Sequence, residues 1–231
     1  KLKHLCSIGE AKVDYGNPLI EVKINKDAKT LHITDQGIGM TAEEVEKYIN
    51  QIAFSGAEEF LEKYKDTAKD AGVIGHFGLG FYSAFMVANE VEIITKSYTD
   101  APAVRWVCDG SPEYSLEETT LRTERGTEII LHINDDSVEF LEEYRIDELL
   151  RKYNRFMPVP IKFGTKQEAL PRPENAPEDY KTEYVTVDNI INDTHPAWTK
   201  KPADLTDEDY REFYHSLYPM QFDEPLFYIH L

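Results

Sequence analysis

The stretch Val73-Ile74-Gly75-His76-Phe77-Gly78-Leu79-Gly80-Phe81-Tyr82-Ser83 decides how the fold of this chain is interpreted. Its three glycines within six residues let the backbone adopt positive φ and pass close to a bound group. Apolar residues follow at helical spacing, so the sequence predicts a glycine-rich turn that opens a helix. The first amides of a helix lack internal acceptors and carry the positive end of its dipole, which favours a phosphate. Tight helix packing is the alternative, whereas the order G-x-x-G-x-G argues against a dinucleotide-binding fold.

A second stretch, Asp35-Gln36-Gly37-Ile38-Gly39-Met40, follows a strand pattern and precedes a helix signature. A carboxylate at a strand end is held by the sheet and accepts hydrogen bonds, and the glycines would let a flat ring lie against the backbone. An adenine amine is a suitable donor, although Asp35 could instead only cap the turn. The two stretches together supply an acceptor for a base and amides for phosphate, which favours a nucleotide.

The charge of the chain limits its partners. The formal net charge is −18, from 43 acidic and 25 basic residues. A field of this sign repels nucleic acid and anionic membranes, so we expect neither as a partner. No apolar run approaches the length of a membrane span. A phosphate would therefore be held by backbone dipoles rather than by a lysine-rich patch.

The cysteines and histidines give no metal signature. Cys6 and Cys108 are far apart, so we expect neither a disulfide framework nor a zinc site, and a reducing compartment such as the cytoplasm fits. The seven histidines do not cluster at ligand spacings, and we expect no bound transition metal. The chain has no initiating Met, and its first five residues resemble the end of a helix, so we expect a fragment of a longer protein.

Apolar periodicity predicts an α+β fold. Alternation at residues 20–24 and 31–33 predicts a hairpin, and Thr41 with Glu44 is a capping box that starts a helix. Alternation at 91–93, 104–108 and 129–133 predicts an antiparallel meander, residues 138–154 a broken helix with Tyr144 on its apolar face, and 158–161 an edge strand. We therefore expect a two-layer α/β sandwich with a mostly antiparallel sheet and helices on one face.

Composition divides the chain into three parts. Residues 1–164 are expected to form the main domain, and the proline-rich, charged residues 165–183 a linker. Residues 184–231 hold a short strand pattern, a helix capped by Thr206 and an aromatic cluster, too little for an independent core. We interpret them as the start of a second domain.

Two further segments bear on a nucleotide site. Residues 56–72 are charged, weakly amphipathic and bracketed by glycines, which suits either a mobile lid or an ordinary solvated helix and loop. Thr127, entering a central strand after Gly126, carries a hydroxyl that would complete an adenine pocket directly or through water.

Four motifs in order carry a family resemblance. They are residues 33–41, Ile52-Ala53-Phe54-Ser55-Gly56, residues 75–83 and Gly126-Thr127. They resemble the successive motifs of the ATP-binding domain of the ninety-kilodalton heat-shock chaperones, most of all the bacterial members. The likeness covers nearly the whole chain, with residues 184–231 similar to the start of the middle domain. More distantly, the motifs resemble gyrase-type topoisomerases, mismatch-repair proteins and sensor histidine kinases, the GHKL superfamily with its Bergerat ATP-binding fold.

The resemblance implies a function and a set of contacts. It implies an ATP-dependent chaperone that is an ATPase, binds ATP or ADP with Mg²⁺, forms a homodimer and acts on client proteins. Asp35 would accept the adenine amine, Thr127 would support it through water, the amides of residues 78–81 would face the phosphates, and residues 56–72 would form the lid. The full set of expected nucleotide contacts is Asp35, Gly39, Met40, Ile49, Ser55, Gly56, Gly75, Phe77, Gly78, Leu79, Gly80, Phe81 and Thr127.

Departures from the family pattern limit what this chain is expected to do. The family's general-base Glu and magnesium-ligating Asn lie on the helix whose end is expected at residues 1–5, so both would precede Lys1. No catalytic residue is therefore expected here, and these residues should hardly turn over ATP, since losing a general base costs roughly 10²–10⁴ in rate. Phe54, Tyr48 and His76 replace a Lys, an Asn and a Gln that the family commonly has. A GHKL-type kinase and a non-catalytic acidic interaction module remain alternatives.

Overall fold

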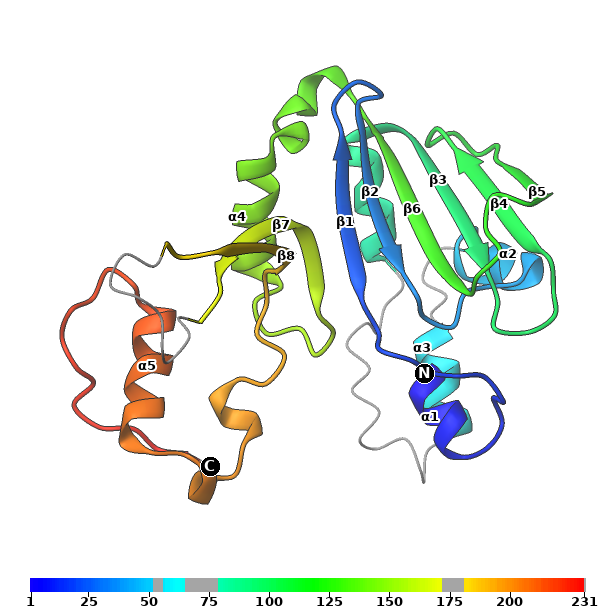
Figure 1. The fold of residues 1–231 in the computed structure, drawn as a ribbon. Coiled ribbons are helices and arrows are strands. Elements are labelled where there is room, and N and C mark those ends of the chain that lie inside the picture. The colour runs from blue at the N-terminus through cyan, green and yellow to red at the C-terminus, as the bar shows by residue number, and fades with distance from the viewer. Residues whose placement is uncertain (52–55, 65–78, 172–180, 231) are drawn as a thin grey trace.

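The computed structural model describes residues 1–51, 56–64, 79–171 and 181–230, which form one eight-stranded sheet with helices (Figure 1). The strands are β1 (Ile20–Asn25), β2 (Thr30–Asp35), β3 (Ala88–Lys96), β4 (Ala103–Cys108), β5 (Ser115–Thr119), β6 (Gly126–Ile133), β7 (Ile161–Ala169) and β8 (Tyr184–Ile190). The α-helices are α1 (Leu2–Ser7), α2 (Ala42–Tyr48), α3 (Gly56–Lys63), α4 (Glu143–Tyr153) and α5 (Asp207–Leu217). The 3-10 helices are η1 (Gly80–Met86), η2 (Asp135–Leu141), η3 (Ala197–Thr199) and η4 (Pro202–Asp204). Within the described ranges, no helix is both long enough and apolar enough to cross a bilayer.

The sheet confirms the α+β prediction. Its strand order is β5-β4-β3-β6-β2-β1-β7-β8, and every neighbouring pair is antiparallel except β1 and β7. The predicted β1–β2 hairpin is present, with Asn25 opposite Thr30. Lys29 in its turn has a φ of 52°, the left-handed conformation that a tight connection requires.

Two strand predictions were wrong. The meander was expected to place β6 after β4, but β6 returns to the other side of β3 and pairs with both β3 and β2. The edge strand expected at residues 158–161 is also wrong, because the prolines precede β7, which begins at Ile161 and lies between β1 and β8. The edges are β8 and β5, and β5 carries too few apolar residues to stand out from the sequence.

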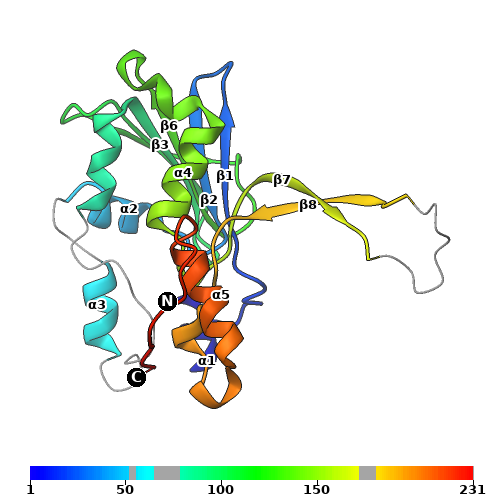
Figure 2. The same cartoon turned by 90° about the vertical axis from the view of Figure 1, so that its left-hand side faces the viewer.

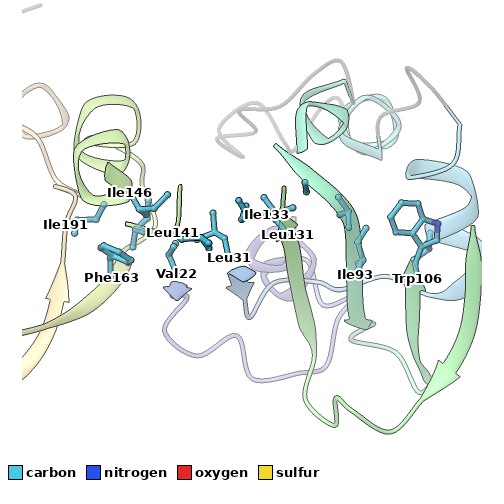
Figure 3. Packing of buried hydrophobic residues seen from close by; sticks show 14 of the residues in the cluster. Val22, Leu31, Ile93, Trp106, Leu131, Ile133, Leu141, Ile146, Phe163 and Ile191 are labelled. Atoms are coloured by element: carbon cyan, nitrogen blue, oxygen red, sulfur yellow. The ribbon is translucent and has the colours of Figure 1, made fainter. Parts of the chain in front are cut away.

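The helices cover one face of the sheet and complete its core. Buried residues form a continuous row from β7 and α4 across β1, β2, β6 and β3 to β4 (Figure 3). On the helical side, Val45 of α2 and Ile146 of α4 are buried against this row, while Phe81 and Phe85 of η1 are partly buried. Tyr144 was expected on this apolar side but is exposed.

The predicted capping box starts α2. The Thr41 side chain accepts a hydrogen bond from the Glu44 amide at 3.3 Å, and the Glu44 carboxylate accepts one from the Thr41 amide at 2.8 Å. This reciprocal pair fixes the first turn and aims the fully buried Val45 at the sheet.

The helix predicted after the glycine-rich turn is present from Gly80 but is a 3-10 helix, η1. None of its side chains is fully buried, and Met86 is 79% exposed. Short 3-10 helices of this kind often serve as connectors between longer elements. Tyr82 anchors η1, since its hydroxyl donates to the carbonyl oxygen of Ile49 at 2.6 Å. This bond ties the helix after the glycine turn to the end of α2.

The expected linker does not begin at residue 165. Residues 165–169 continue β7 and pair with β8, so Thr165 lies opposite Asp188 in the same sheet. Figure 2 shows this hairpin extending away from the rest of the sheet. Beyond β8, Trp198 and Phe213 pack their rings against Phe156, which follows α4. The predicted cap of α5 by Thr206 is confirmed, whereas the division of the chain into domains stays a prediction.

The sheet face away from the helices carries charged pairs. Arg105 of β4 pairs with Glu92 of β3 at 2.6 Å, and His32 of β2 contacts Glu128 of β6 at 2.9 Å. Lys162 of β7 contacts both Glu21 and Asp188. These partly exposed pairs replace a second apolar layer, as is usual for an antiparallel sheet with one covered face.

Substitution of Ile93 tests where the core is centred. This β3 residue is 1% exposed, so Ile93→Ala should lower the free energy of unfolding by roughly 2–5 kcal/mol. Ile190 of β8 is 39% exposed, so Ile190→Ala should have a much smaller effect. Urea unfolding of both variants measures this, and similar losses would contradict the placement of the core.

Candidate functional site

A cavity of about 500 Å³ opens at the end of β2. It lies between the sheet and the helices α1, α2 and α3, and Figure 1 shows α1 and α3 beside the end of β2. The structure brings five of the predicted nucleotide contacts to this cavity: Asp35, Gly39, Met40, Gly56 and Thr127. Its size is in the usual range for small-molecule sites. A hollow of about 660 Å³ between β1, β7 and α4 contains none of the predicted residues that the structure describes.

Asp35 is the last residue of β2 and lies directly opposite Thr127 of β6. Its Oδ1 accepts a hydrogen bond from the Gly37 amide at 2.6 Å. Burial raises the pKa of the Asp35 carboxyl above its ordinary 3.8, although the Gly37 amide and the Arg122 guanidinium act in the opposite direction. An ionised carboxylate has about four acceptor sites, so it can receive a donor from a ligand besides the Gly37 amide.

A buried hydroxyl that sequence analysis missed connects the two sides of the site. Thr95 of β3 is 0% exposed, and its Oγ1 accepts a hydrogen bond from the Met40 amide at 2.9 Å. The same oxygen lies 3.0 Å from Thr127 Oγ1 and 3.2 Å from the Gly126 carbonyl oxygen. A signal was available, because the alternation of Val91 and Ile93 places a polar residue at the next core position.

Two glycines are required by close contacts between backbone segments. Gly39 has a φ of +65°, and a Cβ there would lie 1.8 Å from the carbonyl oxygen of Lys96. Gly126 has a φ of +120°, and its Cβ would lie 2.2 Å from the carbonyl oxygen of Asp35. The ends of β2, β3 and β6 therefore approach so closely that a side chain at either position would push Asp35 or Met40 out of place.

Two arginines before β6 hold the turn that follows Asp35. Arg122 donates from Nη2 to the Asp35 carbonyl oxygen at 2.9 Å. Arg125 donates from Nη1 to the carbonyl oxygens of Gln36 and Gly37, and from Nη2 to those of Asp14 and Tyr15 at 2.8 and 2.7 Å. Sequence analysis missed both, since these contacts join residues about 90 to 110 positions apart.

The far wall of the cavity comes from α1 and α3. Phe60 of α3 and Tyr64, which follows α3, pack with Leu2 and Leu5 of α1 in a second buried cluster. Tyr48 of α2 also lines the cavity, where its hydroxyl donates to Glu59 of α3 at 2.8 Å. Burial and the Glu59 carboxylate raise the pKa of Tyr48 to about 12, so its hydroxyl stays protonated at neutral pH.

The remaining predicted contacts are placed differently. The described residues that line the cavity do not include Ile49, Leu79, Gly80 or Phe81. Phe81 packs its ring 5.8 Å from that of Trp106, Ile49 packs against the main core, and Leu79 and Gly80 are exposed. The other four predicted contacts lie outside the described residues: Ser55, Gly75, Phe77 and Gly78. Phe54, His76 and residues 65–72 of the expected lid also lie outside them.

This geometry suits a flat ring that carries a hydrogen-bond donor. The partly buried Asp35 accepts the donor, Thr127 adds a hydroxyl beside it, and Ile38 and Met40 supply apolar wall. Family models agree: one described as histidine kinase-, DNA gyrase B- and HSP90-like ATPase matches residues 13–137, more than half of the chain. The chain belongs to this ATPase family.

Further comparisons refine the position of the chain within the ATPase family. A model described as Hsp90 protein matches residues 172–231. The chain is 60% identical over its whole length to the chaperone protein HtpG of Bacteroides thetaiotaomicron, and 58% identical to that of Porphyromonas gingivalis. The HtpG of Sulfurimonas denitrificans is 39% identical over 93% of the chain. The chain spans about a third of the length of these relatives, 32–34%.

Arg125 is expected to stabilise the Asp35 turn. Arg125→Ala removes donors to four carbonyl oxygens and should lower the free energy of unfolding by about 1.5–3 kcal/mol. Arg151→Ala is the control, because Arg151 makes only a surface pair with Asp147 and should lose about 0.5 kcal/mol or less. Thermal or urea unfolding measures both, and equal losses would mean that the Arg125 contacts contribute little.

Proposed function

We propose that this chain binds an adenine nucleotide in the cavity at the end of β2, as the nucleotide-binding part of an ATP-driven chaperone of the HtpG type. One observation carries the proposal: the partly buried carboxylate of Asp35 lies opposite Thr127 in a cavity of suitable volume. The family match and the HtpG relatives support the same class of ligand.

The residues present fit the base of such a nucleotide. Asp35 Oδ2 would accept the exocyclic amine, while the Gly37 amide keeps Oδ1 occupied and the carboxylate in one orientation. Thr127 would contact the ring directly or through a water, with Thr95 holding its hydroxyl in place. Met40 and Ile38 would cover the ring. Gly39 keeps the Met40 backbone against β3, so this side of the site is formed before a ligand enters.

The phosphate side is proposed from the sequence pattern and the fold family. Amides of Gly78, Leu79, Gly80 and Phe81 would face the phosphates, with Ser55, Gly56, Gly75, Phe77 and Ile49 nearby. Mg²⁺ would neutralise phosphate charge when bound, and no side chain of this chain is proposed as its ligand. Lys1, whose side-chain pKa is lowered by burial, lines the same cavity and supplies a cation. The segment 56–72 would act as the lid, with α3 as its first turns.

For the whole protein, we propose ATP hydrolysis coupled to a clamp-like homodimer that acts on client proteins in the cytoplasm. The match of residues 172–231 to the Hsp90 model favours a chaperone over a histidine kinase, since a kinase does not need this second segment. For these 231 residues the proposal concerns nucleotide binding, and weak turnover stays a prediction.

Asp35→Asn should reverse the preference between adenine and hypoxanthine. Asp35 accepts the amine of ADP but faces the carbonyl oxygen of inosine diphosphate, so the natural chain should prefer ADP. An Asn would keep its Oδ1 on the Gly37 amide and present an NH₂ donor to the cavity. ADP affinity should therefore fall roughly ten- to hundredfold, the equivalent of about 1.5–3 kcal/mol. Calorimetric titration with both nucleotides measures the switch.

The control for this switch is Asp136→Asn, which removes the same charge from an exposed site in η2 and should leave both affinities unchanged. Binding of ADP by the natural chain with no loss in Asp35→Asn would refute the assignment of Asp35. Absence of ADP binding by both would refute the proposed function of this cavity.

As the pH is lowered, ADP affinity should begin to fall at a higher pH than it would if the carboxylate were exposed. Burial raises the pKa of Asp35, and the amine donor binds the ionised carboxylate, so affinity should be full above this raised pKa and fall as the pH drops through it. Without ligand the sign is opposite, because the folded chain holds the proton more tightly and loses stability as the pH rises through the same range. Titrations from neutral pH downward should show a steeper loss in the natural chain than in Asp35→Asn.

A further inference from the structure

A group of metal-ligating side chains lies on the charged face of the sheet, away from the nucleotide cavity. Glu90 and Glu92 of β3 and His132 of β6 place one ligand atom each within 4.8 Å of one another. His132 Nε2 lies 2.8 Å from Glu92 Oε1 and 3.5 Å from Glu90 Oε1. Neighbouring ligands around a tetrahedral zinc-class ion are about 3.3 Å apart, given metal–ligand distances of about 2.0–2.1 Å. The 2.8 Å contact between His132 and Glu92 would have to open by about half an ångström.

A β-bulge puts Glu90 in this group. The register between β3 and β6 shifts between Ala88, opposite Ile133, and Glu90, opposite His132. Ala88 and Glu90 are two positions apart, and on a regular strand such residues would lie on the same face of the sheet. Here Ala88 is buried in the core, whereas Glu90 points to the charged face beside His132. The bulge interrupts the hydrogen-bond ladder between β3 and β6 and directs the Glu90 carboxylate toward His132. Bulges often redirect a side chain in this way next to active sites.

Arg105 orients the second carboxylate. Its Nη2 and Nε donate to Glu92 Oε2 at 2.6 and 2.7 Å, which leaves Glu92 Oε1 facing His132. The Glu92 side chain is 12% exposed and therefore has little freedom to turn away. An outer partner that fixes a ligand in this way is typical of protein metal sites.

The local charge favours a divalent cation. Glu90, Glu92 and Glu117 meet a single guanidinium, that of Arg105, so two formal negative charges remain when His132 is neutral. One imidazole with two carboxylates is a ligand set for zinc and similar ions, whereas Mg²⁺ prefers oxygen ligands and retained water. Binding takes the lone pair of His132 Nε2, so the proton shared with Glu92 must leave that atom.

We propose that Glu90, Glu92 and His132 bind a divalent transition-metal ion of the zinc class and so cross-link β3 to β6 on the open face of the sheet. Solvent would complete the coordination, because the side chains of Glu90 and His132 are 43% and 35% exposed. Sequence analysis expected no bound transition metal, because these ligands come from strands about 40 residues apart and meet only through the bulged register.

Zinc titration of the nucleotide-free chain by calorimetry, at a pH of about 8, tests the site. The natural chain should bind one ion at this site and show a higher melting temperature with zinc. His132→Ala and Glu90→Gln should each weaken zinc binding about tenfold or more and abolish the shift in melting temperature. Unfolding of both variants without metal establishes that they are folded, and Glu90→Gln changes only a partly exposed side chain.

His32→Ala is the matched control. His32 lies on the same sheet face and contacts one carboxylate, that of Glu128, so it has a similar setting with one ligand fewer. Its removal should leave zinc affinity unchanged. The proposal is overturned if the natural chain binds no zinc, if His132→Ala binds as well as the natural chain, if His32→Ala loses as much affinity, or if Mg²⁺ binds equally well through the net negative charge alone.

Discussion

The candidate site depends on how closely three strand ends approach one another. At Gly39 and Gly126 the backbones of β2, β3 and β6 come within distances that no side chain could occupy. This contact fixes the Asp35 carboxylate relative to Thr127, and the buried Thr95 hydroxyl satisfies the amide that the close approach would otherwise leave without an acceptor. The arginines before β6 hold the same turn from outside, so a polar acceptor is kept rigid at the edge of an apolar core.

The two faces of the sheet differ in chemistry: one is apolar and covered by helices, and the other is charged and open to solvent. The covered face carries the apolar row shown in Figure 3 and ends at the cavity, where desolvation makes the Asp35 carboxylate costly unless a donor reaches it. The open face is charged and solvated, and its carboxylates, guanidinium and imidazoles pair across strands. The chain has a net charge of −18, so at the cavity and on the open face local dipoles or cations decide which ligands can approach.

Local features were predictable from the sequence and long-range ones were not. The β1–β2 hairpin and the Thr41 capping box follow from residues within one turn or strand of each other, and the structure has both. Asp35 was identifiable because a carboxylate ended a strand pattern before glycines. The arginine contacts and the position of β6 depend on pairing between distant segments, which periodicity does not specify. Residues 165–169 of β7 were predicted as linker because they are polar and exposed, whereas β8 lies where the sequence predicted a short strand.

The parallel pairing of β1 with β7 has a consequence for how the chain reaches this structure. Ile20 lies opposite Ile161, so about 140 residues must be made before β1 gains its second neighbour. Loop closure over that distance is slow, and during synthesis the outer edge of β1 stays open after β2 has paired. Nascent chains are therefore most exposed to edge-to-edge association in this interval, and arrival of β7 ends it.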